Sequence, residues 1–221
     1  MTRRLAFYDL DGTLVSSNVV TQYAWYVRRL GSYSRLAKLA LSAPVLLGFE
    51  LYSRRAFNVF FYRFYRGLRR DWLEAQAEGL FEEVFRPNLY PRSSGLVAAD
   101  KGQGFETVLV TGSLDFALGP LVAFFGFDHV IANRLVFRKG VATGEIAPPL
   151  IAENEKVAAM KRLCATRNAD IAQSKAYSDS LSDLPMLEAV GRPAVVHPGR
   201  RLRRVASRRG WPILDLKSAD R

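Results

Sequence analysis

Two aspartates separated by one leucine follow a short apolar stretch near the amino terminus, in the sequence FYDLDGTL at residues 7–14. Side chains two residues apart on a regular strand share a face, so the carboxylates of Asp9 and Asp11 should lie close together. Like charges at that spacing raise each other's pKa unless a cation lies between them. Gly12 then allows the backbone to turn away from the strand. The stretch therefore predicts a strand end at which acidic groups share a cation.

Polar groups also follow two later strand-like stretches, VLVTGS and YSDSLSD, and a lysine lies near the start of the helix predicted between them. These residues are Thr111, Gly112, Ser113, Lys156, Asp179 and Asp183. Open parallel sheets bind ligands beyond the carboxyl ends of their strands. We therefore expect these groups to meet Asp9 and Asp11 at one edge of a sheet.

The chemical types of these groups suit phosphate chemistry assisted by Mg²⁺. Mg²⁺ prefers a few hard oxygen ligands and is usually held by one or two carboxylates together with phosphate. A hydroxyl and backbone amides at a strand-to-helix turn suit phosphate oxygens, and a lysine adds a positive charge. Together they predict phosphoryl transfer, in which one aspartate of the first pair attacks phosphorus and the other transfers protons.

The chain as a whole is expected to form an α/β core with a parallel sheet, interrupted early by helices. Strand-like and helix-like stretches alternate from residue 91 onward, which is typical of parallel strands joined by right-handed crossovers. Residues 17–90 instead contain helical segments rich in aromatic residues and arginine. We therefore predict a core of residues 1–16 and 91–221 and a helical cap of residues 17–90. The stretches expected as strands are 3–10, 106–113, 129–137, 175–180, 193–198 and 211–215, with a hairpin at 138–146.

The four motifs, taken in order, resemble those of the haloacid dehalogenase (HAD) superfamily of hydrolases over essentially the whole chain. The resemblance is closest to the branch that contains phosphoserine phosphatase, subfamily IB, in which a helical cap follows the first motif. YSDSLSDLPML is an especially close match to the last motif of that branch. The resemblance implies a Rossmann-like core, with Asp9 as the nucleophile that forms an aspartyl-phosphate and Asp11 as the general acid and base.

The same resemblance implies roles for the remaining groups. Thr111 and the amide of Gly112 would bind phosphate, and Lys156 would neutralise both the phosphate and the nucleophile. Mg²⁺ is the implied cofactor. The residues implied to hold or support it are Asp9, Asp11 through its carbonyl, Asp179 and Asp183.

Each motif alone also fits a purely structural role. The first could be a calcium-like loop or a plain turn, and the second an ordinary strand-to-helix turn. Lys156 alone fits a surface position on an amphipathic helix, Asp179 fits a helix N-cap, and Asp183 fits a solvated acid. The complete set in order favours the catalytic interpretation far more than any single motif does.

The substrate is expected to be a small organic phosphate other than phosphoserine. Phosphoserine phosphatases carry a glutamate after the first motif that meets the substrate ammonium, and the equivalent place here holds Asn18, which has no negative charge. The alternative is a lipid phosphate at a membrane surface, because the apolar stretch 39–49 and the arginine-rich stretch 54–70 resemble the cap of phosphatidylglycerophosphate phosphatases. A cap that packs its own small core, with its arginines reaching into solvent, is the structural alternative.

Composition sets wider bounds on partners and location. The formal net charge of +11 favours acidic partners, or a basic surface that only maintains solubility. One cysteine, Cys164, excludes an internal disulfide and fits a reducing compartment. The amino terminus does not read as a signal peptide, because its apolar stretch is short and interrupted by acids. We expect a cytoplasmic protein, with peripheral contact to an anionic membrane at its inner face left open.

Nucleic acid is the less favoured partner, although GRRLRRVASRRGW at residues 199–211 is strongly basic. Such a run equally suits the solvated face of a helix. A non-catalytic anion-binding role is also less favoured, because binding alone needs no acid–base partner for a nucleophile. The oligomeric state is left open by the sequence.

Overall fold

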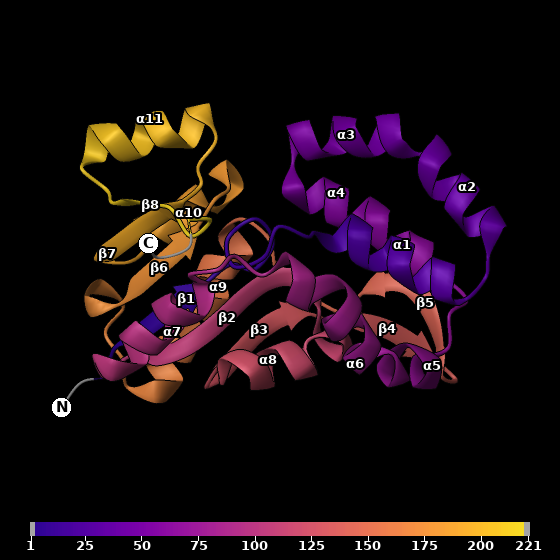
Figure 1. The fold of residues 1–221 in the computed structure, drawn as a ribbon, viewed down its shortest axis with the longest axis horizontal. Coiled ribbons are helices and arrows are strands. Elements are labelled where there is room, and N and C mark those ends of the chain that lie inside the picture. The colour runs from indigo at the N-terminus through magenta and orange to yellow at the C-terminus, as the bar shows by residue number, and fades with distance from the viewer. Residues whose placement is uncertain (1–2, 219–221) are drawn as a thin grey trace.

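The computed structural model describes residues 3–218, apart from the side chain of Glu50. Its centre is a six-stranded sheet with the strand order β3-β2-β1-β6-β7-β8, in which every pair of neighbours is parallel (Figure 1). The parallel α/β core predicted from the alternation of strands and helices is confirmed. The strands are β1 (Leu5–Tyr8), β2 (Glu106–Leu114), β3 (His129–Asn133), β6 (Lys175–Ser178), β7 (Arg192–Val196) and β8 (Ile213–Leu214).

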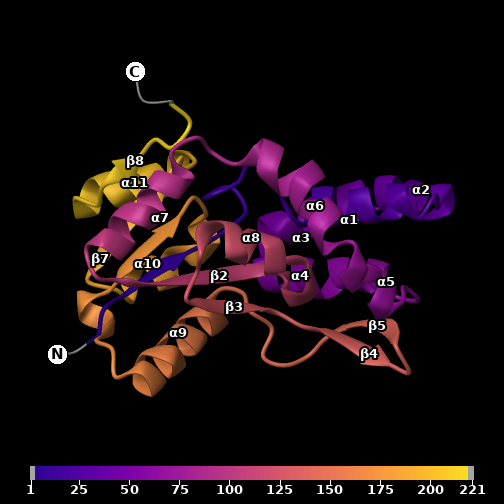
Figure 2. The same ribbon diagram turned by 60° about the horizontal axis from the view of Figure 1, so that its bottom comes forward.

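Helices cover both faces of this sheet, because successive residues of a strand point to opposite sides. In β1, Ala6 belongs to the apolar cluster that includes side chains of α7 and α8, whereas Phe7 belongs to a second cluster with side chains of α9, α10 and α11 (Figure 2). Because β1, β2 and β6 are adjacent and parallel, their carboxyl ends lie side by side at one edge. The helices of the core are α7 (Ser93–Gly102), α8 (Gly119–Phe125), α9 (Asn154–Arg167), α10 (Leu184–Glu188) and α11 (Arg200–Arg209), with single turns at Asp115–Ala117, Ile171–Gln173 and Leu181–Asp183.

Between β1 and α7 the chain forms helices and no strand of the sheet, which fits the helical insert predicted there. Aromatic side chains hold these helices together: the rings of Tyr23, Phe61 and Tyr65 are buried and in mutual contact. Among residues 3–218, no helix has the length and apolar character needed to cross a bilayer. The helices are α1 (Val19–Arg29), α2 (Tyr33–Leu41), α3 (Ala43–Tyr52), α4 (Arg54–Phe61), α5 (Arg70–Ala75) and α6 (Ala77–Leu80), with shorter helical turns at Tyr62–Tyr65, Phe81–Phe85 and Arg86–Asn88.

The prediction of one continuous strand over residues 129–137 was wrong. β3 ends at Asn133, whose side-chain amide donates to the Gly112 carbonyl at 2.7 Å and whose side-chain oxygen accepts the Ile151 N–H at 2.7 Å. These bonds tie the strand end to two other segments, and the chain then leaves the sheet. It forms the predicted hairpin as a separate antiparallel pair, β4 (Leu135–Arg138) and β5 (Val141–Ile146).

This hairpin contacts the helical insert through its backbone. The Gly67 N–H donates to the Ala142 carbonyl at 2.9 Å, and the Arg70 N–H donates to the Gly140 carbonyl at 2.9 Å. In Figure 2 the hairpin extends away from the sheet, close to α5. A segment from the second half of the sequence therefore supports the insert. The predicted division of the chain into a core and a cap stays a prediction.

Candidate active site

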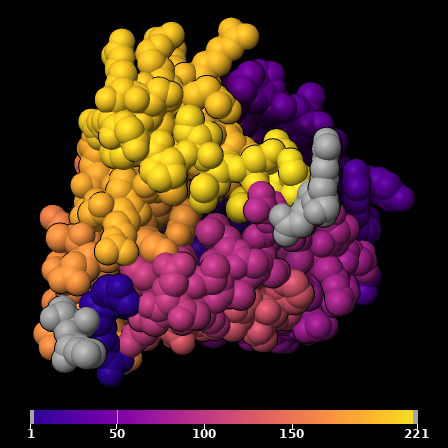
Figure 3. Space-filling model, turned by 60° about the vertical axis from the view of Figure 1, so that its left-hand side comes forward, coloured from indigo at the N-terminus to yellow at the C-terminus, as the bar shows by residue number. Residues whose placement is uncertain are grey.

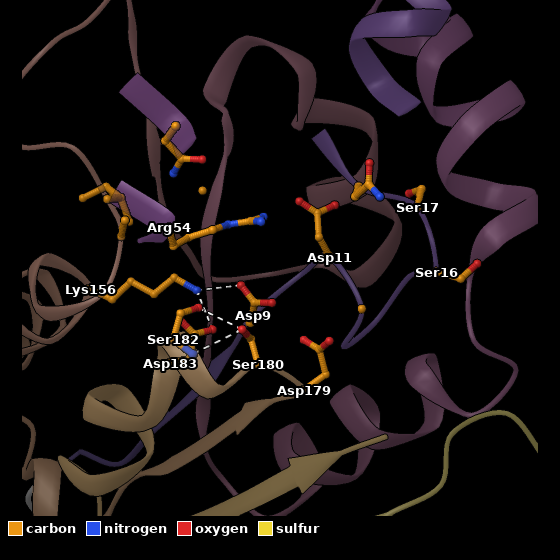
Figure 4. A pocket seen from close by; sticks show the side chains of 16 residues that line it. Asp9, Asp11, Ser16, Ser17, Arg54, Lys156, Asp179, Ser180, Ser182 and Asp183 are labelled. Carbon is orange, nitrogen blue, oxygen red and sulfur yellow. Dashed lines mark hydrogen bonds and ion pairs between the residues drawn. The ribbon is translucent and has the colours of Figure 1, made fainter. Parts of the chain in front are cut away.

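A cavity of about 230 Å³ lies where β1, β2 and β6 end, and the segments that begin α1 and α4 also line it (Figure 4). All but one of the residues predicted from the motifs line this cavity. The exception is Thr111, which is fully buried beside it. Segments far apart in the sequence thus converge, as the parallel order of the three strands requires. The predicted residues at the cavity are Asp9, Asp11, Asn18, Gly112, Lys156, Asp179 and Asp183.

Asp9 is the first residue after β1, so its carboxylate lies at the sheet edge. The side chain is 9% exposed. Its Oδ1 lies 2.7 Å from Nζ of Lys156, and its Oδ2 lies 3.3 Å from the Thr13 hydroxyl. Burial raises the pKa of Asp9, and the charge of Lys156 opposes that rise. Asp9 is therefore a buried carboxyl group at the cavity wall whose ionised form is favoured by the neighbouring cation.

Lys156, in the first turn of α9, links two acidic groups. Its Nζ donates to Asp9 and, at 2.8 Å, to Oδ2 of Asp183, which also accepts a hydrogen bond from Ser178 at 2.8 Å. Burial alone would lower the pKa of Lys156, but the two carboxylates outweigh burial and raise the pKa above its usual value. The lysine is thus held protonated. Asp183 serves here to orient Lys156, because one of its oxygens already accepts two hydrogen bonds.

Asp11 has different partners. The Ser113 hydroxyl donates to its Oδ2 at 3.0 Å, and the Gln22 amide donates to its Oδ1 at 3.2 Å. Burial, and then the negative charge of Asp9, raise the pKa of Asp11 to about 7. A carboxyl group with that pKa can both release and accept a proton near neutral pH, which is what general acid–base catalysis requires.

Asp9 and Asp11 share a cavity, as predicted, but they do not share a face of a regular strand. β1 ends at Tyr8, so Asp9 and Asp11 lie in the loop that follows and not on a continuing strand. The loop still directs both carboxylates into the cavity (Figure 4). It turns at Gly12, where φ is +86°, a conformation that glycine adopts without strain.

Asp179 follows β6 and lies against the same loop. One hydroxyl, that of Thr13, lies 3.1 Å from Oδ1 of Asp179 and 3.3 Å from Oδ2 of Asp9, so the two carboxylates are neighbours. Burial, then the charges of Asp9 and Asp183, raise the pKa of Asp179 to about 7. A β-carbon at Gly12 would lie 2.2 Å from Oδ2 of Asp179, so only glycine leaves space for this carboxylate.

These residues fit Mg²⁺ better than they fit a transition metal. Within residues 3–218, no group of three or more His, Cys, Asp and Glu side chains forms a ready-made metal site. Mg²⁺ characteristically binds one or two carboxylates and completes its shell with other oxygens. Asp9 and Asp179 supply two neighbouring carboxylates whose mutual repulsion a cation would relieve. The donor set is therefore compatible with the predicted cofactor.

Two predicted residues are engaged in local structure. The Thr111 hydroxyl accepts the Ser113 N–H at 3.0 Å. Asn18 caps α1: its side-chain oxygen accepts the N–H groups of Val20 and Thr21 at 3.0 and 3.1 Å. Asn18 nevertheless lines the cavity. Its neutral amide occupies the place for which the family resemblance implies a glutamate in phosphoserine phosphatases.

Two further residues that line the cavity come from the helical insert and were not predicted from the sequence. Arg54, at the start of α4, points toward Asp11, and its charge partly opposes the rise that burial causes in the pKa of Asp9 and Asp11 (Figure 4). Asn58, one turn later, is fully buried, and its amide has no hydrogen-bond partner among the described residues. The i, i+4 spacing of these polar residues in an aromatic-rich helix was the available signal. Gln22 carried no comparable signal, whereas Ser113 belongs to the polar strand end VLVTGS that the sequence already indicated.

Comparisons with known proteins agree over most of the chain. A family model described as haloacid dehalogenase-like hydrolase matches residues 6–188. A probable phosphatase of Mycobacterium tuberculosis is 32% identical over 222 residues, which cover 97% of this chain and 76% of that protein. A histidinol-phosphatase of Neisseria meningitidis is 26% identical over 228 residues, which cover 97% of this chain and 100% of that protein. The apo crystal structure of a phosphoserine phosphatase has the same fold, with a TM-score of 0.71, 17% identity and coverage of 99% of this chain and 95% of that chain.

Proposed function

Because this chain belongs to the haloacid dehalogenase-like hydrolase family, we propose that it hydrolyses phosphomonoesters through an aspartyl-phosphate at Asp9. Two relatives that align with 97% of the chain are named as phosphatases, which supports this enzyme class. The observation that carries the mechanism is a single cavity with two carboxylates in different surroundings. Lys156 holds the carboxylate of Asp9, whereas Ser113 and Gln22 donate to that of Asp11.

In the first step, a carboxylate oxygen of Asp9 attacks phosphorus and the bond from phosphorus to the ester oxygen breaks. Asp11 gives its proton to the departing alkoxide, which leaves as the alcohol. A pKa of about 7 means that part of the Asp11 population carries the required proton at neutral pH. The products of this step are the free alcohol and phosphorylated Asp9.

In the second step, water attacks the phosphorus of the aspartyl-phosphate, and Asp11 accepts a proton from it. The phosphorus–oxygen bond to Asp9 breaks, which releases inorganic phosphate and restores the carboxylate. Asp11 returns to its protonated form, so the proton balance closes over one turnover. The hydrogen bonds from Ser113 and Gln22 keep the Asp11 carboxyl oriented toward the cavity in both steps.

Positive charge at the cavity would stabilise the phosphoryl group as it transfers. Lys156 contributes from beside Asp9, and Arg54 contributes from the insert (Figure 4). Mg²⁺ held by Asp9, Asp179 and the Asp11 carbonyl would neutralise further phosphate charge. Thr111 and the Gly112 amide remain the proposed phosphate contacts at the end of β2.

The leaving group that we propose is small, polar and without a required ammonium group. The buried hydroxyl of Ser17 and the buried amide of Asn58 line the cavity and have no hydrogen-bond partner among the described residues. Buried polar groups are nearly always hydrogen-bonded, so these atoms suit polar atoms of a ligand. Asn18 adds a second neutral amide. Neutral recognition groups favour hydroxyl- or amide-bearing phosphates over phosphoserine.

A phosphate ester carried by a lipid is the second candidate. The observation that favours it is the exposed apolar surface of α3, which ends next to the groove that leads into the cavity. A lipid substrate would present its phosphate at a membrane surface, and the enzyme would then act there.

The test is a phosphatase screen with Mg²⁺ that spans amino-alcohol phosphates, polyol and sugar phosphates, nucleotides and lipid phosphates. We expect a polar, soluble monoester to be hydrolysed best, and phosphoserine poorly. The Asp9→Asn variant should show background activity only, and the surface variant Asp215→Asn should match the parent chain. Failure to hydrolyse any ester above the Asp9→Asn background would refute the proposal, and hydrolysis of lipid phosphates alone would favour the second candidate.

A further inference from the structure

Helix α3 and the end of α2 expose apolar side chains to an unusual degree. Leu41 is 82% exposed, Leu47 is 61% exposed and Leu51 is 81% exposed. Among the described side chains of α3, only Leu46 is buried. Scattered exposed apolar residues are normal on a protein surface, but a continuous apolar patch marks an interaction site.

The exposed residues do not form a single stripe along α3. Glu50 is the one charged residue in its sequence, APVLLGFELY, and the described side chains of the helix form no separate polar face. Packing against the rest of the insert covers one side only, at Leu46 and partly at Phe49. In Figure 1, α3 lies at the top of the molecule, to the right of α11.

Helix α11 lies on the same side of the molecule and is strongly basic. It carries six arginines, all exposed, and no acidic residue. Arg209 forms an ion pair with Glu188, and the guanidinium group of Arg209 also lies over the ring of Trp211. The inner face of the helix packs on the sheet through Leu202 and Ala206, so the arginines face solvent. The arginines are Arg200, Arg201, Arg203, Arg204, Arg208 and Arg209.

A groove connects these two helices with the cavity. It is lined by Leu51 and Tyr52 from the end of α3 and by Arg200 and Arg201 from the start of α11. It shares Asp179 and other residues with the wall of the active-site cavity. Figure 1 shows α3 and α11 on either side of a gap above the sheet, and in Figure 3 the yellow and indigo segments both reach the top of the molecule.

We propose that this face docks on the surface of an anionic lipid bilayer, with α3 inserted among the lipids and the arginines of α11 over the headgroups. Apolar insertion combined with attraction between basic side chains and anionic lipid is the usual mode of peripheral membrane binding. A second copy of the chain is a poorer match, because pairing this face with itself would bring two arginine-rich helices together at a net charge of +11 each. The groove then opens toward the membrane.

The inference does not depend on the proposed function. Docking follows from the surface alone, and it would hold for a soluble or a lipid substrate. It does predict that the enzyme acts close to the membrane, on phosphates that are produced or consumed there.

The test measures co-sedimentation of the chain with vesicles of neutral phosphatidylcholine, with and without added anionic phosphatidylglycerol. We expect binding to the mixed vesicles to be at least tenfold tighter than to neutral vesicles, and to weaken as salt is raised. The apolar variant Leu41→Ser/Leu47→Ser and the charge variant Arg203→Gln/Arg204→Gln should each weaken binding at least fivefold.

The matched control is Arg138→Gln/Lys139→Gln, which removes two exposed positive charges from the hairpin and should bind like the parent chain. All variants should hydrolyse a soluble aryl phosphate at the parent rate, because none of the substituted residues lines the cavity. If neither the parent chain nor any variant hydrolyses the aryl phosphate, the proposed function fails. The result of the vesicle-binding experiment is not affected by that failure.

Equal affinity for neutral and anionic vesicles would overturn the proposal. So would a hairpin control that loses as much vesicle affinity as the Arg203→Gln/Arg204→Gln variant. So would a dimer in analytical ultracentrifugation that the Leu41→Ser/Leu47→Ser variant converts to monomer, since the face would then be a self-association surface. Retention on single-stranded DNA that depends on Arg203 and Arg204, without vesicle binding, would assign α11 to nucleic acid instead.

Discussion

The Nζ atom of Lys156 lies 2.7 Å from Oδ1 of Asp9, and both side chains are at least nine-tenths buried. The same ammonium group lies 2.8 Å from Asp183. One buried cation therefore compensates two buried carboxylates at the end of β1. This arrangement links the stability of the fold to the reactivity of the site, because the residue that neutralises Asp9 is also the residue that makes its burial tolerable.

Replacing Lys156 with Met should therefore reduce both stability and activity. Removing one partner of a buried ion pair leaves uncompensated charge and typically costs about 3–5 kcal/mol of unfolding free energy. The loss of charge stabilisation at phosphorus should lower kcat on the order of a hundredfold or more. Urea denaturation and steady-state kinetics measure the two effects. The control Lys161→Met, an exposed position on the same helix, should change neither, and a stable, active Lys156→Met variant would show that the ion pair is incidental.

Replacing Asn58 with Leu should raise KM while leaving stability unchanged or improved. The Asn58 amide has no hydrogen-bond partner among the described residues. An apolar side chain of similar size would therefore remove an unsatisfied buried polar group from the fold. If the amide binds the substrate, its loss should raise KM about tenfold, the effect of one hydrogen bond.

Asn133 provides the matched comparison, because its buried amide is fully engaged with Gly112 and Ile151. Asn133→Leu should lower the free energy of unfolding by roughly 1–3 kcal/mol, because it leaves those buried backbone groups without a hydrogen-bond partner. If Asn58→Leu destabilised the chain as much as Asn133→Leu and left KM unchanged, Asn58 would be a structural residue with no part in substrate binding.

The metal-free chain should lose stability as the pH rises from 5 to 8. The pKa of Asp11 and of Asp179 is about 7 in the fold, against 3.8 for an ordinary aspartate. Between those two pKa values the folded chain binds more protons than the unfolded chain, so the free energy of unfolding falls as the pH rises. The stability that the two protonated carboxyl groups contribute is lost as the pH passes through about 7. Thermal unfolding in EDTA measures this dependence.

The variant Asp179→Asn should flatten that dependence, because it removes one of the two titrating groups. Added Mg²⁺ should stabilise the parent chain most at pH 8, where both carboxylates are ionised in the absence of metal. A metal-free chain whose melting temperature does not depend on pH, or an Asp179→Asn variant with the slope of the parent, would contradict the described environment of these carboxylates.

Replacing Gly12 with Ala should weaken Mg²⁺ dependence specifically. The added β-carbon would lie 2.2 Å from Oδ2 of Asp179, so that carboxylate must move. Gly140→Ala is the control: its φ is also positive, at +75°, but a β-carbon there meets nothing within 4 Å. Both substitutions should cost about 1–2 kcal/mol for left-handed backbone. Only Gly12→Ala should raise the Mg²⁺ concentration needed for activity, by tenfold or more. Equal Mg²⁺ dependence in the two variants would show that Asp179 does not hold the metal.

The sequence predicted the sheet and the convergence of its polar strand ends because both depend on local patterns. Asp9, Lys156 and Asp179 each follow from a strand end or a helix start, and the parallel order of the strands brings them together. The break after Asn133 was missed, because it depends on side-chain bonds to Gly112 and Ile151, which are distant in the sequence.

The insert was harder to place for the same physical reason. Arg54 and Asn58 reach the cavity only through the packing of α4 against the aromatic core of the insert. The i, i+4 spacing of Arg54 and Asn58 marks a polar face on α4, but the local sequence does not state that this face turns toward the sheet edge. The exposure of α3 was left open, since the apolar stretch 39–49 fitted both a cap that faces a membrane and a cap that packs its own small core.

The central claim is that Asp9 becomes phosphorylated during turnover, and acid quenching tests it directly. Parent chain mixed with its preferred ester and Mg²⁺ is quenched within the first turnovers, cleaved with trypsin, and the fragment Leu5–Arg28 is analysed by tandem mass spectrometry. We predict that this fragment gains one phosphoryl group, located on Asp9 and not on Asp11, and that the group is absent without substrate. Steady hydrolysis with no phosphate on this fragment, or with phosphate on another residue, would contradict the mechanism.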